Sequence, residues 1–137
     1  MRVLIVDDSA IMRTIIKRAV MLAQVPADDI LEAANGAEAF AILESRDVQL
    51  LLTDINMPVM SGIDLLRKLA GDRRWNNMVR VVISTDGSVC RQDEVAGLAV
   101  CRYLEKPFTA EIMRVVLGEV TRAPHAYAAR AMPDPRD

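Results

Sequence analysis

The stretch "VLIVDDSAIMR", residues 3–13, joins four consecutive apolar residues to two adjacent carboxylates. The apolar run Val3–Val6 is typical of a buried strand, and helical periodicity begins after Ser9. Asp7 and Asp8 therefore stand at the carboxyl end of that strand, where burial and mutual repulsion both disfavour their charged forms. This arrangement predicts that a positively charged group lies close to the two carboxylates.

The same order, a short apolar run followed by a longer segment of helical period, occurs five times along the chain. The runs are continuous rather than alternating, which is typical of parallel strands covered by helices on both faces. The pattern predicts a three-layer, doubly wound α/β fold with a five-stranded parallel sheet and five helices. The predicted strands are Val3–Val6, Ile30–Ala33, Leu50–Thr53, Val79–Ser84 and Cys101–Leu104.

Local signals mark the starts of two of the helices. Ser61 with Asp64 forms a predicted capping pair, and Thr109 is the predicted N-cap of the last helix. The fourth helix, predicted over Gly87–Leu98, has the weakest pattern because glycines bracket it. The polar surroundings of Arg73–Trp75 predict a solvated loop.

Composition limits the classes of function. The chain has 137 residues, of which 52% are hydrophobic and 26% charged, as expected of one globular domain. A net charge of −2 with interspersed signs offers no basic face for nucleic acid. No apolar run approaches the roughly 18 residues of a membrane span, and Cys90 and Cys101 lack metal-binding spacing. We expect a soluble, cytoplasmic protein that does not insert into membranes.

The helical pattern stops at Arg122. We therefore expect one domain over residues 1–122 and a flexible, proline-containing tail over residues 123–137. The single histidine, His125, lies in that tail, so we expect no histidine-based catalysis.

Polar residues follow several of the predicted strands. Asp54 follows the third strand, Ser84 closes the fourth, and Lys106 follows the fifth. Ligands of open parallel sheets bind outside the carboxyl ends of the strands, where these groups join Asp7 and Asp8. An all-oxygen cluster without cysteine or histidine suits Mg²⁺, and the lysine and hydroxyl are further donors for phosphate oxygens. The cluster predicts a phosphoryl-binding site with one carboxylate free to act as nucleophile.

Plain structural interpretations stand beside this one. Asp7 is also compatible with helix capping beside Ser9, Ser84 with a turn hydroxyl, and Lys106 with a solvated charge. The chain has neither a GxGxxG nor a GxxxxGK[ST] loop for a nucleotide. Asn56 stands where a haloacid-dehalogenase-type phosphatase would have its catalytic acid, which disfavours that enzyme.

The motifs "VLIVDDSAIMR", "LLTDINMPVMSG", "VVIST" and "YLEKPF", in this order and spacing, resemble the receiver domain of two-component response regulators. The likeness covers about residues 1–122 and is nearest to stand-alone receivers of the chemotaxis type. It implies a flavodoxin-like sheet of strand order 2-1-3-4-5. It also implies that Asp54 is the phosphoacceptor and that Lys106 pairs with the phosphoryl group. Mg²⁺, or Mn²⁺ in its place, would then be bound by Asp7, Asp8, Asp54 and the main-chain carbonyl of Asn56.

The resemblance further implies that Ser84 and Tyr103 form the switch, while Asn56 and Asp86 tune self-dephosphorylation. It implies a cis peptide bond between Lys106 and Pro107. The implied partners are a sensor histidine kinase and a downstream protein, bound by the face of the fourth helix, fifth strand and fifth helix. No enzymatic activity is expected beyond self-phosphorylation and self-dephosphorylation. For Tyr103, the alternative is an ordinary half-buried aromatic anchored by its hydroxyl.

One departure from the family pattern concerns the fifth strand. Many receivers have glycine and alanine, and then a further glycine, before the aromatic residue, whereas this chain has Ala99, Val100 and Arg102. Arg102 borders the expected output face. Two other functions stay open: a phosphorelay intermediate that passes phosphate to a histidine phosphotransfer protein, and a receiver fragment of a longer transcriptional regulator.

Overall fold

The computed structural model describes residues 1–86 and 89–122. The predicted tail, 123–137, lies outside the described residues. Strands and helices alternate along the chain, and each predicted strand lies within one residue of its predicted bounds. The elements are β1 (Arg2–Val6), α1 (Ala10–Leu22), β2 (Asp29–Ala33), α2 (Gly36–Ser45), β3 (Leu50–Thr53), α3 (Gly62–Ala70), a 3-10 turn η1 (Arg73–Trp75), β4 (Val79–Ser84), α4 (Val89–Val95), β5 (Val100–Glu105) and α5 (Ala110–Arg122).

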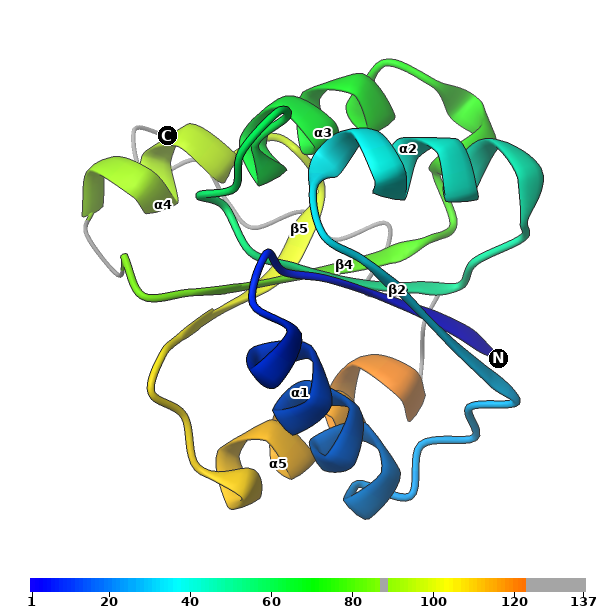
Figure 1. Cartoon of the computed structure of the whole chain (residues 1–137), viewed down its shortest axis with the longest axis vertical. Helices are drawn as coiled ribbons and strands as arrows, with labels where there is room; N and C mark the ends of the chain where they lie inside the picture. Colours follow the sequence, from blue (N-terminus) through cyan, green and yellow to red (C-terminus); the bar gives the residue numbers. More distant parts are fainter. Residues whose placement is uncertain (87–88, 123–137) are drawn as a thin grey trace.

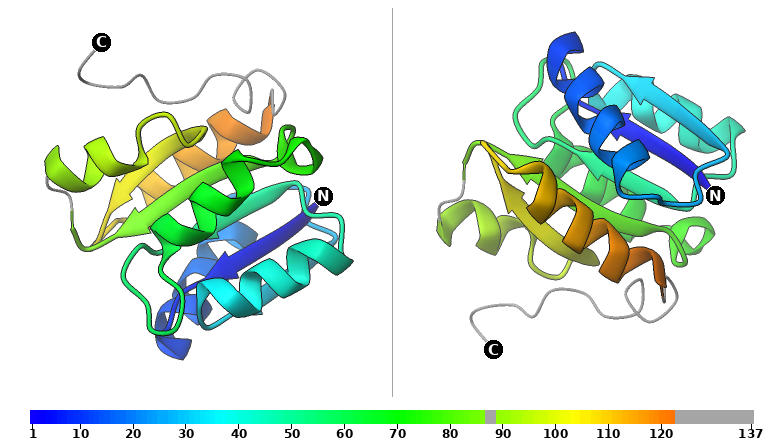
Figure 2. Two further views of the ribbon diagram at one scale, coloured as in Figure 1. Left: turned by 90° about the horizontal axis from the view of Figure 1, so that it is seen from above. Right: turned by 90° about the horizontal axis from the view of Figure 1, so that it is seen from below.

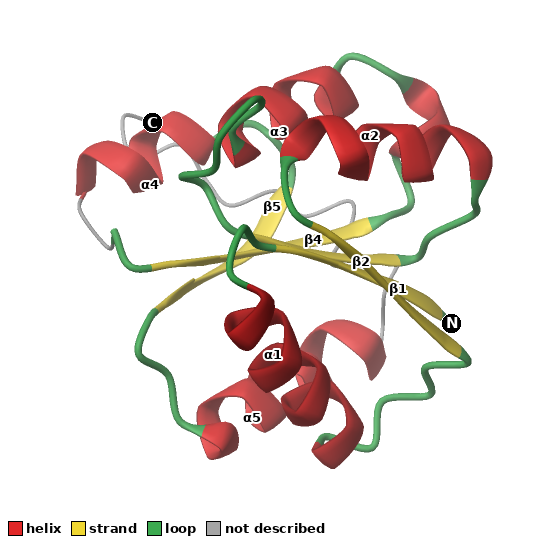
Figure 3. Cartoon of the chain, in the orientation of Figure 1, coloured by secondary structure: helices red, strands yellow, loops and turns green. Residues whose placement is uncertain are grey.

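All neighbouring strands pair in parallel, in the order β2-β1-β3-β4-β5. Helices α1 and α5 cover one face of the sheet, and α2, α3 and α4 cover the other (Figures 1 and 3). The predicted three-layer, doubly wound fold is therefore confirmed. Because the strands run in one direction, their carboxyl ends meet along a single edge of the sheet (Figure 2).

Two apolar cores flank the sheet. Alternate side chains of β1 enter opposite cores: Val3 and Ile5 pack towards α1 and α5, whereas Leu4 and Val6 pack towards α2 and α3. Every residue of β3 and β4 is buried. Burial on both faces is the physical reason for the continuous apolar runs in the sequence.

The predicted helix starts are also present. The Ser61 hydroxyl accepts a hydrogen bond from the Asp64 N–H at 3.1 Å, and the Thr109 hydroxyl accepts one from the Ile112 N–H at 3.1 Å. These bonds satisfy N–H groups that the first turn of a helix leaves without partners. None of the helices within the described ranges is long and apolar enough to cross a bilayer.

The structure corrects the predicted solvated loop at residues 73–75. Arg73 and Arg74 are exposed, but Trp75 is only 7% exposed. Its ring meets Phe40 edge to face, with 5.5 Å between ring centroids. The large apolar ring closes the core at the end of the sheet where β4 begins, whatever the polarity of its chain neighbours. Its carbonyl accepts a hydrogen bond from Arg80, a fully buried β4 side chain whose pKa is lowered by burial.

Helix α4 is shorter than the predicted 87–98 segment. Its described helical residues are Val89–Val95, and residues 87–88 are outside the described part of the chain. The carboxyl end stops early because residues 96–99 form a turn, in which Gly97 has a φ of 82°. Ala99 in the same turn also has a positive φ, 60°, which is a conformation that favours glycine.

Candidate functional site

Three carboxylates meet at the carboxyl edge of the sheet. Asp7 and Asp8 follow β1, and Asp54 follows β3, the neighbouring strand. One ligand oxygen from each lies within 4.8 Å of the others. Asp7 and Asp54 are buried, while Asp8 is exposed. The predicted acidic cluster is therefore present, with one member open to solvent.

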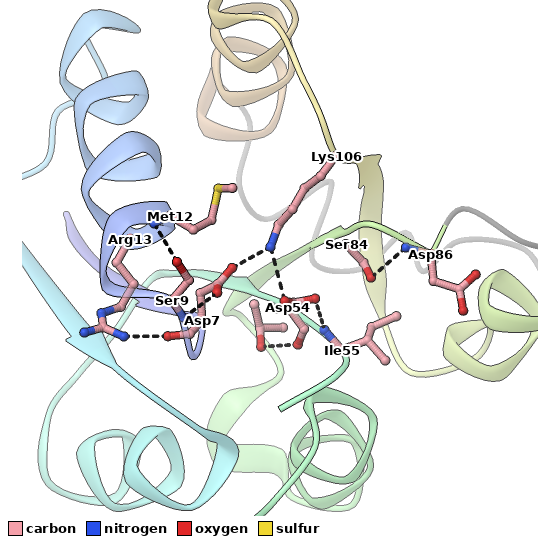
Figure 4. Close-up of polar contacts among 10 residues, drawn as sticks. Asp7, Ser9, Met12, Arg13, Asp54, Ile55, Ser84, Asp86 and Lys106 are labelled. Carbon is pink, nitrogen blue, oxygen red and sulfur yellow. Dashed lines mark hydrogen bonds and ion pairs between the residues drawn. The ribbon is translucent and has the colours of Figure 1, made fainter. Parts of the chain in front are cut away.

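Lys106, which follows β5, reaches into this cluster (Figure 4). Its ammonium donates to Asp7 Oδ2 at 2.6 Å and to Asp54 Oδ2 at 3.2 Å, and its side chain is 7% exposed. Burial alone would lower the pKa of Lys106, but the hydrogen bond to Asp7 and the charges of Asp54 and Asp7 outweigh burial and raise it. The lysine thus compensates part of the negative charge, at Asp7 and Asp54, and a solvated charge is the wrong interpretation.

Asp54 is held by the backbone around it. Its Oδ1 accepts from the Ile55 N–H at 2.7 Å, and its own N–H donates to the Val6 carbonyl at 2.9 Å. Gly62, the first residue of α3, packs directly on this segment: a Cβ there would lie 1.9 Å from the Asp54 carbonyl oxygen. The Gly62 N–H also donates to the Ile55 carbonyl at 2.7 Å. The packing of the amino end of α3 thereby fixes the position of the Asp54 backbone.

The structure separates the roles of Asp7 and Ser9. Ser9 is the N-cap of α1, with its hydroxyl accepting from the Met12 N–H at 3.2 Å. Asp7 Oδ1 accepts from the Ser9 N–H at 2.9 Å, which leaves Oδ2 for Lys106. The Arg13 guanidinium donates to the Asp7 carbonyl at 2.6 Å. Asp7 therefore braces the turn into α1 without capping the helix itself.

Ser84 and Tyr103 both contact the loop that follows β4. Ser84 is fully buried, and its hydroxyl accepts from the Asp86 N–H at 3.2 Å. The half-buried Tyr103 donates its hydroxyl to the Asp86 carbonyl. Burial raises the pKa of Tyr103, while a hydrogen bond with Ser84 acts in the opposite direction. Tyr103 is thus an anchored aromatic in this conformation, and its rotation stays a prediction.

The predicted cis peptide bond between Lys106 and Pro107 is present. The Lys106 N–H donates to the Ser84 carbonyl at 2.7 Å, which ties this segment to the end of β4. The site thus takes backbone support from the two strands β4 and β5 as well as from β1 and β3.

Sequence reasoning missed one residue at the rim of the site. Arg91, in the first turns of α4, donates to Asn56 Oδ1 at 3.1 Å and to Asp86 Oδ2 at 3.3 Å. Asn56 itself is exposed. The available signal was a basic side chain five residues after Asp86, but it lay in the helix with the weakest pattern.

The donor set suits a hard divalent cation. Three carboxylates against one ammonium leave two negative charges at the site. Oxygen ligands without cysteine or histidine are those that Mg²⁺ prefers. The residues present therefore fit Mg²⁺, with the open side of the cluster at Asp8.

Fold and site together define a flavodoxin-like α/β domain that carries an acidic cluster and a buried lysine where its strands end. A family model described as response regulator receiver domain matches residues 3–117. The chain belongs to this family, and its likeness is to the CheY type of receiver.

Curated relatives are similar over most of their length. The chain is 36% identical over 121 residues to a chemotaxis protein CheY homolog of Campylobacter jejuni, covering 88% of this chain and 92% of that protein. It is 38% identical over 123 residues to chemotaxis protein CheY1 of Helicobacter pylori, covering 86% of this chain and 98% of that protein.

Solved structures agree with the fold. The chemotaxis response regulator CheY4 of Vibrio cholerae superposes with a TM-score of 0.77 at 26% identity, over 87% of this chain and 97% of that one. A CheY-like receiver domain protein of Methanospirillum hungatei gives a TM-score of 0.80 at 23% identity, over 91% and 96% of the two chains.

Proposed function

We propose that this protein is a phosphorylation-controlled switch that accepts a phosphoryl group on Asp54 from a phosphohistidine of a sensor histidine kinase. The observation that carries the proposal is the buried Asp54 carboxylate, which shares the Lys106 ammonium with Asp7 beside an acidic cluster. Asp54 follows β3, the central strand of the sheet, so its carboxylate stands in the middle of the edge.

In the transfer step, an Asp54 carboxylate oxygen attacks phosphorus, and the bond between phosphorus and the kinase histidine nitrogen breaks. The Ile55 N–H holds one Asp54 oxygen at 2.7 Å and so fixes the orientation of the carboxylate. Lys106 places a positive charge where the phosphoryl oxygens arrive. The contribution of these residues is positioning and electrostatics rather than proton transfer.

Mg²⁺, or Mn²⁺ in its place, would supply charge neutralisation for the phosphoryl oxygens. Asp7, Asp8, Asp54 and the main-chain carbonyl of Asn56 would hold the ion. The protein's own chemistry would be limited to self-phosphorylation and self-dephosphorylation.

The switch would run from Ser84 to Tyr103. Ser84 is hydrogen-bonded to the Asp86 N–H, and the Tyr103 hydroxyl is bonded to the Asp86 carbonyl. A phosphoryl group that draws Ser84 towards Asp54 would disturb the support of Tyr103 and let its ring turn. The surface of α4, β5 and α5 would then change its preferred conformation and bind a downstream protein. The names of the relatives support a role in chemotaxis-like signalling.

Intact mass measured after incubation with acetyl phosphate and Mg²⁺ tests the acceptor. We expect one phosphoryl adduct on the wild type, its loss in Asp54→Asn, and its loss when the metal is chelated. Asp64→Asn, at an exposed aspartate of α3, is the matched control and should be modified like the wild type. An unmodified wild type, even with rapid sampling and a cognate kinase, would contradict the proposal.

A further inference from the structure

Arg91 joins the two loops that flank Asp54. From α4 it donates to Asn56 Oδ1, in the loop after β3, at 3.1 Å. It donates to Asp86 Oδ2, in the loop after β4, at 3.3 Å. Two further bonds, of 3.1 and 3.3 Å, bind its guanidinium to Glu94 one turn along α4. The side chain is 31% exposed, so it lies at the rim of the site rather than within it.

The contact with Asp86 fixes where that carboxylate points. Figure 4 shows the Asp86 side chain directed away from Asp54, although its backbone N–H is bonded to Ser84. Arg91 pairs with this carboxylate, with 3.3 Å between Nε and Oδ2. Asn56 and Glu94 anchor the guanidinium, so the pair is held at three points rather than by one exposed ion pair.

Hydrolysis of an acyl phosphate on Asp54 requires a water that attacks phosphorus from outside. The water oxygen bonds to phosphorus, the bond between phosphorus and the Asp54 oxygen breaks, and Asp54 regains its carboxylate. One proton of the water must pass to an acceptor, and the carboxylate of Asp86, in the loop after β4, would serve if it turned inwards. In the conformation described, the Asp86 carboxylate is bonded to Arg91 and directed away from Asp54 (Figure 4).

We propose that Arg91 is a positioning residue that lengthens the phosphorylated state by holding the Asp86 carboxylate away from the attacking water. This inference rests on the proposed phosphorylation of Asp54. The guanidinium of Arg91 donates to Asn56, Asp86 and Glu94. We expect its effect to run through Asp86, because that carboxylate is the proton acceptor in the hydrolysis step.

The test is the decay of the phosphoryl adduct, followed by intact mass after the donor is removed and Mg²⁺ is kept. We expect Arg91→Gln to lose the adduct about tenfold faster than the wild type, below the roughly 10²–10⁴ of a fully positioned proton acceptor. Arg114→Gln removes the same charge from an exposed pair within α5 and should decay like the wild type. In an Asp86→Asn background, Arg91→Gln should have no further effect, which a merely structural role would not produce.

The outcomes separate this inference from the proposed function. A wild type that forms no adduct would refute the phosphorylation itself. An adduct that decays equally fast in the wild type and in Arg91→Gln would overturn the inference alone. Acceleration that persists in the Asp86→Asn background would also overturn it, because the effect would then bypass Asp86.

Discussion

Replacing Gly62 with alanine tests how tightly α3 fixes the phosphoacceptor segment. The added Cβ would lie 1.9 Å from the Asp54 carbonyl oxygen, whereas real Cβ atoms essentially never come within 3.0 Å of such an atom. The two backbone segments must therefore separate by about 1 Å. Neither neighbour is a flexible side chain, since the nearest atoms belong to the backbone of Asp54 and Ile55.

Three contributions set the size of the effect of Gly62→Ala. Overpacking of a well-packed site costs about 1–3 kcal/mol. Weakening of the bond from the Gly62 N–H to the Ile55 carbonyl costs about 1 kcal/mol more. The better helix propensity of alanine returns at most about 1 kcal/mol. We expect a net loss of about 2 kcal/mol in the free energy of unfolding.

Urea unfolding followed by circular dichroism measures this loss as a lower midpoint with an unchanged slope. The matched control is Gly118→Ala in α5, where a Cβ would meet no atom within 4 Å. We expect that variant to gain about 0.5–1 kcal/mol. Phosphorylation of Gly62→Ala by acetyl phosphate should also slow by about 100-fold, because the nucleophile is displaced by about 1 Å. A Gly62→Ala protein with wild-type stability and phosphorylation rate would refute the reasoning.

Three further predictions concern the metal, Tyr103 and the turn before β5. Mg²⁺ at 100 times its dissociation constant should stabilise the wild type by about 2.7 kcal/mol, as measured by calorimetry. Asp8→Asn should lose most of this gain. Equal gains in both proteins would contradict metal binding by Asp8. Burial raises the pKa of Tyr103 above its ordinary 10.0, so the folded state binds the phenol proton more tightly than the unfolded state. The resulting contribution to stability is present below pH 10.0 and is lost as the pH rises through the folded pKa. An ultraviolet titration compared with Tyr103→Phe checks this prediction, and ionisation of Tyr103 at or below its ordinary pKa would refute it. Ala99→Gly should raise the free energy of unfolding by up to about 1 kcal/mol, because Ala99 has a φ of 60°. Ala41→Gly, at an exposed position in the middle of α2, should instead lower it by about 1 kcal/mol. A change of the same sign in both variants would contradict the prediction.

The central strands were predictable because they are covered on both faces. Leu50–Thr53 has the predicted bounds, and all of its residues are buried, so its apolar run has no polar interruption. The site was predictable for a related reason. Asp7 and Lys106 are 99 positions apart in the sequence, yet both follow strands of one parallel sheet and so arrive at the same edge.

The surroundings of Trp75 and Arg91 were not predictable, because they depend on neighbours in space that lie far away in the sequence. Trp75 is surrounded by polar residues in the chain, but its contact in space is Phe40. Arg91 reaches Asn56, 35 positions away, only because α4 starts where it does after β4. Its glycine-flanked segment has little periodicity, so neither the bounds of α4 nor that contact follow from the pattern.

The position of Trp75 has an optical consequence. It is the only tryptophan in the sequence, and it precedes β4, whose other end carries Ser84. The six residues of β4 separate the indole from the acidic cluster by roughly 20 Å at about 3.3 Å per residue. Intrinsic tryptophan fluorescence should therefore change when the core around Phe40 opens, and stay nearly constant when Asp54 or its neighbours bind a ligand. The chain carries a natural reporter of its own unfolding that is insensitive to occupancy of the site.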